Sequence, residues 1–503
     1  MTDGGGGQPG FALRDSRLTR WVASWAAIDL RSLAAVRIAL ASCVLADLGL
    51  RSTDLTSLYS DHGLLPRADL LLEWPTAFAT TPSLLFAGGD FAFLLLFFTV
   101  AALASVSLLV GYRSRTCAAL VWFFVTSIHL RNPQVLYGVD PLLRLVPLWL
   151  ALLPCGAVWS FDSVLAGSKR RSPPPWLSVA GIGLIVQIFV VYFIAGVAKM
   201  ADASWMQGHG FGQVLDYVLL VRPAGQWLHD HVALSTAANW FVIALELVAP
   251  FTLFAPLRWW RVRVFTVVLL ATMHVGIFAT MTVGFFTVVP VACILVAIPG
   301  AFWDRFSRIK AVEPSAPVRF PERSWLPTEG LAALMLVWTV VWNIGLWSDA
   351  DYKVPSPLVH VGDTLALDQK WGMFTQLGAT GTFDVPGTLD DGTTIDLLAA
   401  GGPLPSLAQA RAGRGPASTP ALEFKNIYWR IVYVALSERP NDSPRFSALG
   451  RYYCREFNND RPEGRSLERV EIIFKARTPS ADPDDRVRRQ IESLALWNHD
   501  CFG

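Results

Sequence analysis

The sequence predicts an all-α polytopic membrane bundle of about nine transmembrane helices, followed by a C-terminal soluble β-rich α+β domain. Of the 503 residues, 53% are apolar and only 16% are charged, whereas a soluble domain carries about 25% charged residues. Long apolar runs alternate with short polar connections up to about residue 348, after which the composition becomes that of a soluble domain. Lipid is therefore the expected solvent for the first two thirds of the chain.

Nine apolar segments are candidates for membrane spans, because a bilayer core needs about 20 helical residues. The first carries Arg37 and Asp47, and the third is short. The stretch Val264–Pro299 would be about 54 Å long as one helix, so we expect two spans with a turn near Gly284. The nine segments run near 32–50, 91–112, 116–130, 139–158, 177–199, 238–256, 264–281, 284–300 and 328–347.

Lys and Arg residues are unevenly divided between alternate connections, and basic residues are retained on the cytoplasmic side. One set of connections holds five of them, namely Arg51, Arg67, Arg131, Lys199 and Arg222. The other set holds seventeen, namely Arg14, Arg17, Arg20, Arg31, Arg113, Arg115, Lys169, Arg170, Arg171, Arg258, Arg261, Arg263, Arg305, Arg308, Lys310, Arg319 and Arg323. We therefore expect a cytoplasmic N-terminus and, after nine spans through the plasma membrane, an extracytoplasmic C-terminal domain.

These boundaries divide the chain into four parts: a cytoplasmic segment (1–30), the main transmembrane domain (31–310), a linker with the last span (311–348) and the soluble domain (349–503). A net charge of only +2 predicts no nucleic-acid partner. No CxxC or HExxH spacing is present, so no metal site is expected, and the GxGxxG and Walker patterns are absent. The oligomeric state does not follow from the sequence.

The C-terminal domain contains several strand signals. Asp391-Gly392 lies within the run Gly387–Leu398 and indicates a β-hairpin. Alternating apolar residues predict strands over Tyr428–Leu436 and Leu467–Lys475, and a loose loop is expected near 400–420. Cys454 and Cys501 are the two cysteines in polar sequence, and on an oxidising side they would form either a disulfide or two free thiols.

Lys199 is the one lysine bordering a span, at the end of a helix that also carries Tyr192 and Gly196. The spacing i, i+4, i+7 places the three residues on one helix face. A partly buried lysine can act as a base, which arginine cannot. The alternatives are that Lys199 reaches the outer headgroups or pairs with Asp202.

Three other places carry ionisable groups inside spans, where such groups mark functional or pairing sites. Glu246 lies near mid-membrane and must be either protonated or paired. His274 is either a packing residue or a proton carrier. Asp140 and Arg144 have i, i+4 spacing and could form a surface ion pair instead of a site.

Six segments in a fixed order resemble the bacterial horizontally transferred transmembrane domain (HTTM) family, which is related to vitamin K-dependent gamma-carboxylase. The similarity covers roughly residues 30–310, with one further element in the soluble tail. The segments are YSDHGLLPR (59–67), GYRSR (111–115), RNP with YGVDPLLR (131–144), SFD (160–162), YFIAGVAKM (192–200) followed by Trp205 and Gly208, and WGMF (371–374).

The resemblance implies a chemistry for these residues. In the carboxylase, a lysine that ends the corresponding helix deprotonates vitamin K hydroquinone, and Lys199 matches that lysine; His274 and Gly284 resemble a histidine and a glycine at the same spacing. The resemblance therefore implies a carboxylase-like or quinone-dependent enzyme, of lyase or epoxidase type, acting at the outer membrane face on a secreted peptide or protein. Its catalytic residues would be Lys199, His274 and Arg144, and a quinone or hydroquinone would be bound by Tyr192, Gly196, Glu246 and Trp205.

Two other classes of function remain open. Pro133 precedes Leu136-Tyr137-Gly138 where the carboxylase has a catalytic histidine, and the tail does not resemble its propeptide-binding region. A non-catalytic membrane factor, which helps to mature or export a secreted peptide or binds a redox partner, is therefore the alternative. A solute transporter is the third possibility, although the sequence has no visible repeat or pair of interrupted helices.

Overall fold

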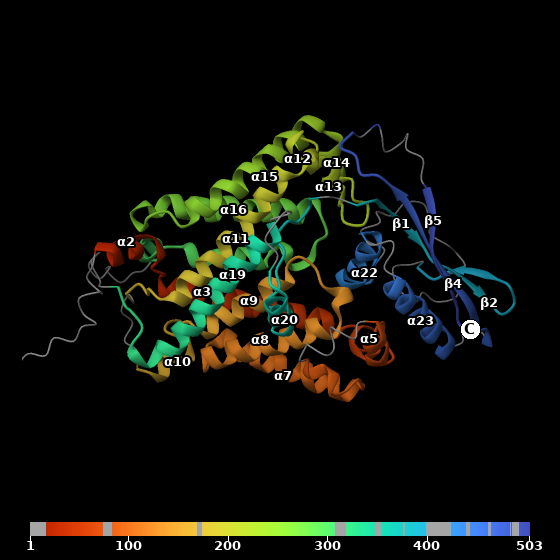
Figure 1. Ribbon diagram of the computed structural model, residues 1–503, viewed down its shortest axis with the longest axis horizontal. Coiled ribbons are helices and arrows are strands. Elements are labelled where there is room, and N and C mark those ends of the chain that lie inside the picture. The colour runs from red at the N-terminus through yellow and green to blue at the C-terminus, as the bar shows by residue number, and fades with distance from the viewer. Residues whose placement is uncertain are drawn as a thin grey trace, which may run out of the picture.

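The computed structural model describes residues 17–73, 83–167, 174–306, 318–347, 354–375, 378–398, 424–438, 443–460, 464–482, 484 and 492–502. Figure 1 shows an elongated helical body with α2 (Arg17–Ala26) at one end and a β-sheet with helices at the other. The predicted fold class, a helical membrane bundle followed by a β-rich α+β domain, is confirmed.

Six described helices are long and apolar enough to cross a membrane, and each overlaps one of the predicted spans. Polar caps begin several of them: the Asp90 side chain accepts a hydrogen bond from the amide of Phe93, and the Ser178 hydroxyl accepts one from Gly181. The six are α3 (Leu30–Ser52), α7 (Phe91–Val110), α11 (Val179–Ala201), α15 (Val232–Leu253), α16 (Trp260–Thr280, preceded by the 3-10 turn η3, Leu257–Trp259) and α19 (Leu326–Trp347).

The other three predicted spans are shorter helices packed among the long ones. They are α8 (Ser114–Arg131), α9 (Asp140–Ala151) and the segment Gly284–Ala297, which consists of η4 (Gly284–Thr287), α17 (Val289–Ile294) and η5 (Leu295–Ala297). Gly284 has a φ of +56° and makes the predicted turn after α16. The expected division of Val264–Pro299 into two segments is therefore confirmed, with a short second segment. Most side chains of α9 are buried by protein, so lipid does not dictate its length.

Short helices connect these segments. They are α4 (Leu55–Tyr59), α5 (Arg67–Glu73), η1 (Leu84–Phe86), η2 (Pro133–Val135), α10 (Phe161–Leu165), α12 (Ala203–Met206), α13 (Gly210–Leu215), α14 (Pro223–Asp230), α18 (Gly300–Phe306) and η6 (Arg323–Trp325).

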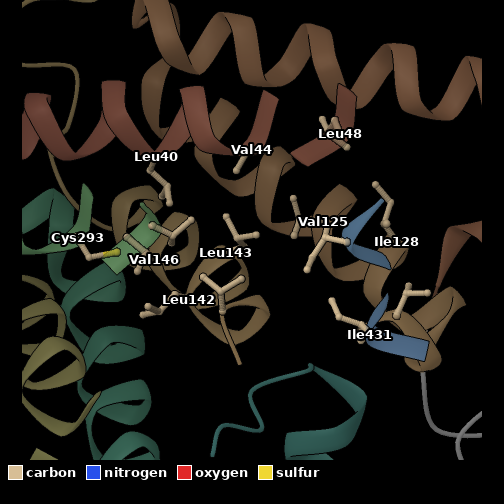
Figure 2. Packing of buried hydrophobic residues seen from close by; sticks show 14 of the residues in the cluster. Leu40, Val44, Leu48, Val125, Ile128, Leu142, Leu143, Val146, Cys293 and Ile431 are labelled. Carbon is tan, nitrogen blue, oxygen red and sulfur yellow. The ribbon is translucent and has the colours of Figure 1, made fainter. Parts of the chain in front are cut away.

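The hydrophobic core lies between α3, α8 and α9 and extends into the C-terminal domain. Figure 2 shows aliphatic side chains from these helices together with Ile431 of α22 (Ile427–Glu438), a helix of that domain. The labelled members from the bundle are Leu40, Val44, Leu48, Val125, Ile128, Leu142, Leu143, Val146 and Cys293. Bundle and domain therefore share one continuous core.

The C-terminal sheet has five strands, β1 (Thr380–Asp384), β2 (Pro386–Leu389), β3 (Thr394–Asp396), β4 (Leu467–Arg477) and β5 (Glu492–Asp500). β4 is central: β1 and β2 pair along one side of it and β5 along the other, all antiparallel. β2 and β3 form the predicted hairpin, with Gly392 at φ +78° in its turn. The strand predicted over Leu467–Lys475 is also confirmed. The predicted loop near 400–420 lies outside the described residues.

The strand predicted over Tyr428–Leu436 is wrong, because these residues form α22. Residues 427–433 are all buried, so alternation between an apolar and a polar face has no meaning there. Asn426 supplies the start signal that the pattern missed, since its side-chain oxygen accepts hydrogen bonds from the amides of Tyr428 and Trp429. Two further helices belong to this region, α20 (Ser356–Thr364) and α23 (Ser443–Asp460).

The domain is fastened to the bundle through buried charges. The Tyr428 hydroxyl donates to Asp47 at 2.6 Å, and Asp47 also accepts from Arg51 at 2.8 Å. The same guanidinium reaches Asp140 at 3.0 Å, and all three charged side chains are at least 97% buried. Asp54 accepts hydrogen bonds from Lys425 and Asn426. An unpaired charge in this position would be very costly, so these contacts fix where the domain sits.

These charged pairings all join the domain to the same end of the bundle. Arg477 pairs with Asp216 between α13 and α14, and Arg451 pairs with Asp69 on α5. The opposite end holds several members of the strongly basic set: Arg31 pairs with Asp304, the Arg263 guanidinium donates to the carbonyl of Trp25, and the backbone of Arg319 pairs with that of Trp176. The two sets of connections distinguished in the sequence therefore lie at opposite ends.

A disulfide joins Cys454 of α23 to Cys501 just after β5, across 47 residues of sequence. Of the two pairing states left open for these residues, the structure has the disulfide. Cys43, Cys117, Cys155 and Cys293 are free.

Maleimide labelling of the denatured, unreduced protein should modify four of the six cysteines. Replacing both Cys454 and Cys501 by Ser should lower the stability of the C-terminal domain by about 2–4 kcal/mol, because the open chain gains entropy on unfolding. Denaturant unfolding monitored by limited proteolysis would measure this, with Cys43→Ser as the control. Modification of all six thiols in the wild type would contradict the pairing.

Candidate functional site

Helix α11 carries three of the predicted site residues on one buried face. Tyr192 and Lys199 are 4% and 2% exposed, and Gly196 between them is buried as well. The helix begins at the Ser178 cap and runs without a break to Ala201, so the i, i+4, i+7 spacing is preserved. The predicted shared face is therefore confirmed.

Lys199 forms a buried ion pair with Glu246 of α15. The Nζ atom lies 2.8 Å from Oε2 and 3.1 Å from Oε1, and it donates a third, longer hydrogen bond of 3.4 Å to the carbonyl of Met373. All three ammonium hydrogens thus have an acceptor. Of the alternatives for Lys199, neither the headgroups nor Asp202 is its partner, since Asp202 caps α12 instead. Glu246 was expected to be either protonated or paired, and it is paired with Lys199.

Gly196 allows α15 to approach closely enough for this pair. A methyl group at this position would lie 3.0 Å from the Leu247 side chain and 3.1 Å from Cβ of Glu246. Contacts that short require the neighbour to move. Gly196 therefore positions Glu246 against Lys199 by having no side chain, and it offers no group to a ligand.

His274 of α16 faces the same space from the other side. Its Nε2 lies 3.1 Å from the Tyr192 hydroxyl, and the ring is 2% exposed. Nδ1 faces the backbone of Phe286 without a hydrogen bond of ordinary geometry. The imidazole also makes an edge contact with the Phe286 ring, at 5.8 Å between centroids.

The segment Trp371–Phe374, here called the strap, closes the site from the C-terminal side. Its carbonyls bind two site residues: Met373 accepts from Lys199, and Phe374 accepts from the Trp205 indole at 2.8 Å. The Trp205 ring in turn lies 5.1 Å from the Lys199 ammonium, close enough for a cation–π contact. Phe374 has a φ of +62°, a conformation that costs free energy for a residue other than glycine.

Together these residues line a cavity whose empty space, including the part open to solvent, is about 710 Å³. Its walls are apolar apart from the Lys199–Glu246 pair, the Tyr192 hydroxyl and the His274 ring. The remaining lining residues are Leu142, Val191, Ala195, Trp205, Phe211, Val214, Val242, Met273, Ile277, Met281, Phe286, Pro290, Trp371, Met373 and Phe374.

Arg144 is the one predicted catalytic residue that does not line the cavity. It is 3% exposed on α9, and its guanidinium binds the side chain and the carbonyl of Asp368, at 3.0 and 3.2 Å. The surface ion pair suggested for Asp140 and Arg144 is wrong, because both are buried and Asp140 pairs with Arg51. Each charge binds a different, more distant segment, which short-range spacing cannot reveal.

Sequence reasoning did not place the strap in the site. The WGMF motif is one of the segments that carry the family resemblance. Nothing in it indicates that this segment, about 170 residues after Lys199, contacts the Lys199 ammonium group. The partnership of Lys199 with Glu246 was missed for the same reason, although the burial cost of each charge required a partner.

The arrangement joins an ion pair to an apolar, aromatic-walled cavity. The pair places an amine nitrogen and a carboxylate within hydrogen-bond distance of each other at the wall of the cavity. Cavities of this kind suit an apolar ligand with one or two polar groups.

Comparison with known proteins identifies the family. No solved structure matches the chain. The sequence model of the HTTM domain matches residues 25–303, which is more than half of the chain and includes Lys199, Glu246 and His274. The chain therefore belongs to the HTTM family, and it is a multi-pass membrane protein that shares this domain with vitamin K-dependent gamma-carboxylase.

Proposed function

We propose that the protein is a carboxylase-like or quinone-dependent enzyme that binds a quinone-class lipid in the cavity and acts on a secreted peptide or protein. The observation that carries the proposal is the buried Lys199–Glu246 pair in an otherwise apolar cavity. A purely structural pair has no need of an adjoining cavity, whereas a proton-transfer site needs both.

The residues present fit a quinone or hydroquinone. Phe286, Phe374 and Trp205 provide aromatic walls for a flat ring. The Tyr192 hydroxyl and the Lys199 ammonium could each bind a ring oxygen. A reduced quinone supplies an acidic ring hydroxyl and, with oxygen, the oxidising power that a carboxylase-type reaction requires.

Lys199 is the proposed proton acceptor, and Glu246 makes this possible. Transfer of one proton from Nζ to the carboxylate leaves a neutral amine beside a neutral acid, without moving net charge into the cavity. The amine can then take a proton from a ring hydroxyl and becomes the ammonium group again. Tyr192 and His274 would stabilise the negative charge that develops. Arg144 takes no part in this scheme, because its guanidinium is bound to Asp368.

The proposed orientation has the C-terminal domain outside the plasma membrane and the N-terminus in the cytoplasm. The domain packs against the bundle end that has few basic residues, and α2 lies at the other end (Figure 1). Six long spans alone would return the chain to its starting side, so an odd number of the three shorter segments must also cross. The Cys454–Cys501 disulfide fits an oxidising compartment.

One observation favours the alternative, a non-catalytic factor for the maturation or export of a secreted peptide or for binding a redox partner. The hydrogen bonds of Lys199 are complete without any ligand. A role that only holds α11 and α15 together would require no more than this.

A pair of variants separates the two functions. Lys199→Met should cost about 3–5 kcal/mol of stability, because it leaves Glu246 buried without a counter-charge. Lys199→Met combined with Glu246→Gln should recover most of that loss. If Lys199 is the base, the double variant is folded yet inactive in quinone-dependent turnover after reconstitution. Full function of the double variant would favour the non-catalytic role, whereas full quinone-dependent turnover of Lys199→Arg would show that Lys199 is not the base.

Ligand occupancy tests the cavity directly. Mass spectrometry of co-purified lipid should find a quinone in the wild type. Tyr192→Phe and His274→Ala should each lower the affinity for added hydroquinone about tenfold, through loss of one hydrogen bond in an apolar site. Arg222→Gln is the control, since Arg222 lies outside the cavity lining and bonds to Thr282. Equal affinity in all four proteins would place the ligand elsewhere.

Orientation is tested by accessibility. A protease site inserted in the hairpin turn at Gly392, which has open space around it, should be cut by protease added to the outside of spheroplasts. A site inserted before Arg17 should be cut only after lysis. Cleavage at Gly392 only from the cytosol would reverse the orientation and remove the proposed secreted substrate.

A further inference from the structure

Helix α2 has an apolar stripe that no described residue covers. Leu18 and Trp21 are 68% and 62% exposed, and they continue into the partly buried Val22 and Trp25 at helical spacing. The helix packs on the body through Ala23 and Ala26 instead, both of which are buried. Exposing a large apolar side chain such as that of Trp21 to water is unfavourable. This stripe therefore indicates contact with an apolar or interfacial partner.

A basic stripe runs beside the apolar one. Arg17 and Arg20 are exposed on the neighbouring face of α2. The turn η3 and the start of α16 add Arg258 and Arg261, also exposed, with Arg258 lying over the Trp259 ring at 5.4 Å. None of these four guanidinium groups lies within ion-pair distance of a described carboxylate, unlike Arg31 nearby.

The two elements form one surface. The Arg263 guanidinium donates to the carbonyl of Trp25 at 2.6 Å and to that of Ala255, also at 2.6 Å, and so ties the end of α2 to the turn before α16. In Figure 1, α2 lies at the end of the body farthest from the C-terminal sheet. Two spans begin here, α3 at Leu30 and α16 at Trp260. The surface therefore lies where headgroups and acyl chains meet.

We infer that α2 and the start of α16 form a binding surface for anionic phospholipid headgroups. Arg17, Arg20, Arg258 and Arg261 would contact the phosphates, while Leu18 and Trp21 would insert among the upper acyl carbons. Amphipathic helices with aromatic and basic residues bind the interface in this way, and basic clusters at the ends of spans select anionic lipids. This surface is at the opposite end from the domain and does not depend on the chemistry of the cavity.

The test compares lipid binding by the full-length protein and its variants. Native mass spectrometry after addition of phosphatidylglycerol or phosphatidylcholine should show preferential retention of phosphatidylglycerol by the wild type. Replacing the four arginines by Gln should weaken phosphatidylglycerol binding about tenfold or more, and Arg17→Gln with Arg20→Gln alone should have part of that effect without touching the bundle. Arg113→Gln, in the turn before α8 and outside α2 and the start of α16, is the control and should behave as the wild type.

Three results would overturn the inference. These are equal retention of the two lipids by the wild type, unchanged phosphatidylglycerol retention in the fourfold variant, and an equal loss in the Arg113→Gln control. Inorganic phosphate at matched ionic strength should not displace the bound lipid. Displacement by phosphate would assign the arginines to a free anion instead of the membrane surface.

Discussion

Each charge buried in this bundle needs a partner, either an opposite charge or, as at Arg37 and Arg263, backbone carbonyls, and this requirement determines which segments lie side by side. Arg51 is wholly buried and binds Asp47 one turn earlier and Asp140 of α9. Lys199 binds Glu246 and so joins α11 to α15. Arg144 binds Asp368 and so joins α9 to the chain that leads to the sheet. In a medium that solvates charges poorly, an error in any of these pairings would cost several kcal/mol.

The same requirement accounts for the unusual position of the cavity. The Lys199–Glu246 pair needs a dry environment to remain tightly coupled, yet in the proposed function a ligand must be able to reach it. The protein meets both needs by building one wall from the strap, whose backbone carbonyls also accept hydrogen bonds from Lys199 and Trp205. The strap is therefore held in place by hydrogen bonds from Lys199 and Trp205, two residues that line the cavity. In the proposed function, the same polar groups would serve both the structure and the reaction.

The architecture could largely be predicted from the sequence, because apolar length and the placement of arginines are local signals. The hairpin at Gly392, the strand β4, the turn at Gly284 and the shared face of Tyr192, Gly196 and Lys199 all follow from spacing along the chain. The partners of Lys199, Arg144 and Asp140 could not be predicted, because each lies 47 or more residues away. The error at α22 has a related cause: a segment buried on every side loses the polar face from which its period could be recognised.

The strap comes from the last third of the chain, more than 60 residues beyond the end of the matched HTTM domain. During synthesis, the helices that carry Lys199, Glu246 and His274 are complete well before the strap leaves the ribosome. Until then the cavity lacks the wall that Trp371, Met373 and Phe374 provide. Synthesis is therefore ordered in time. The partly synthesised chain already holds all the ionisable site residues, but it lacks the closed cavity that would let them select one ligand over another.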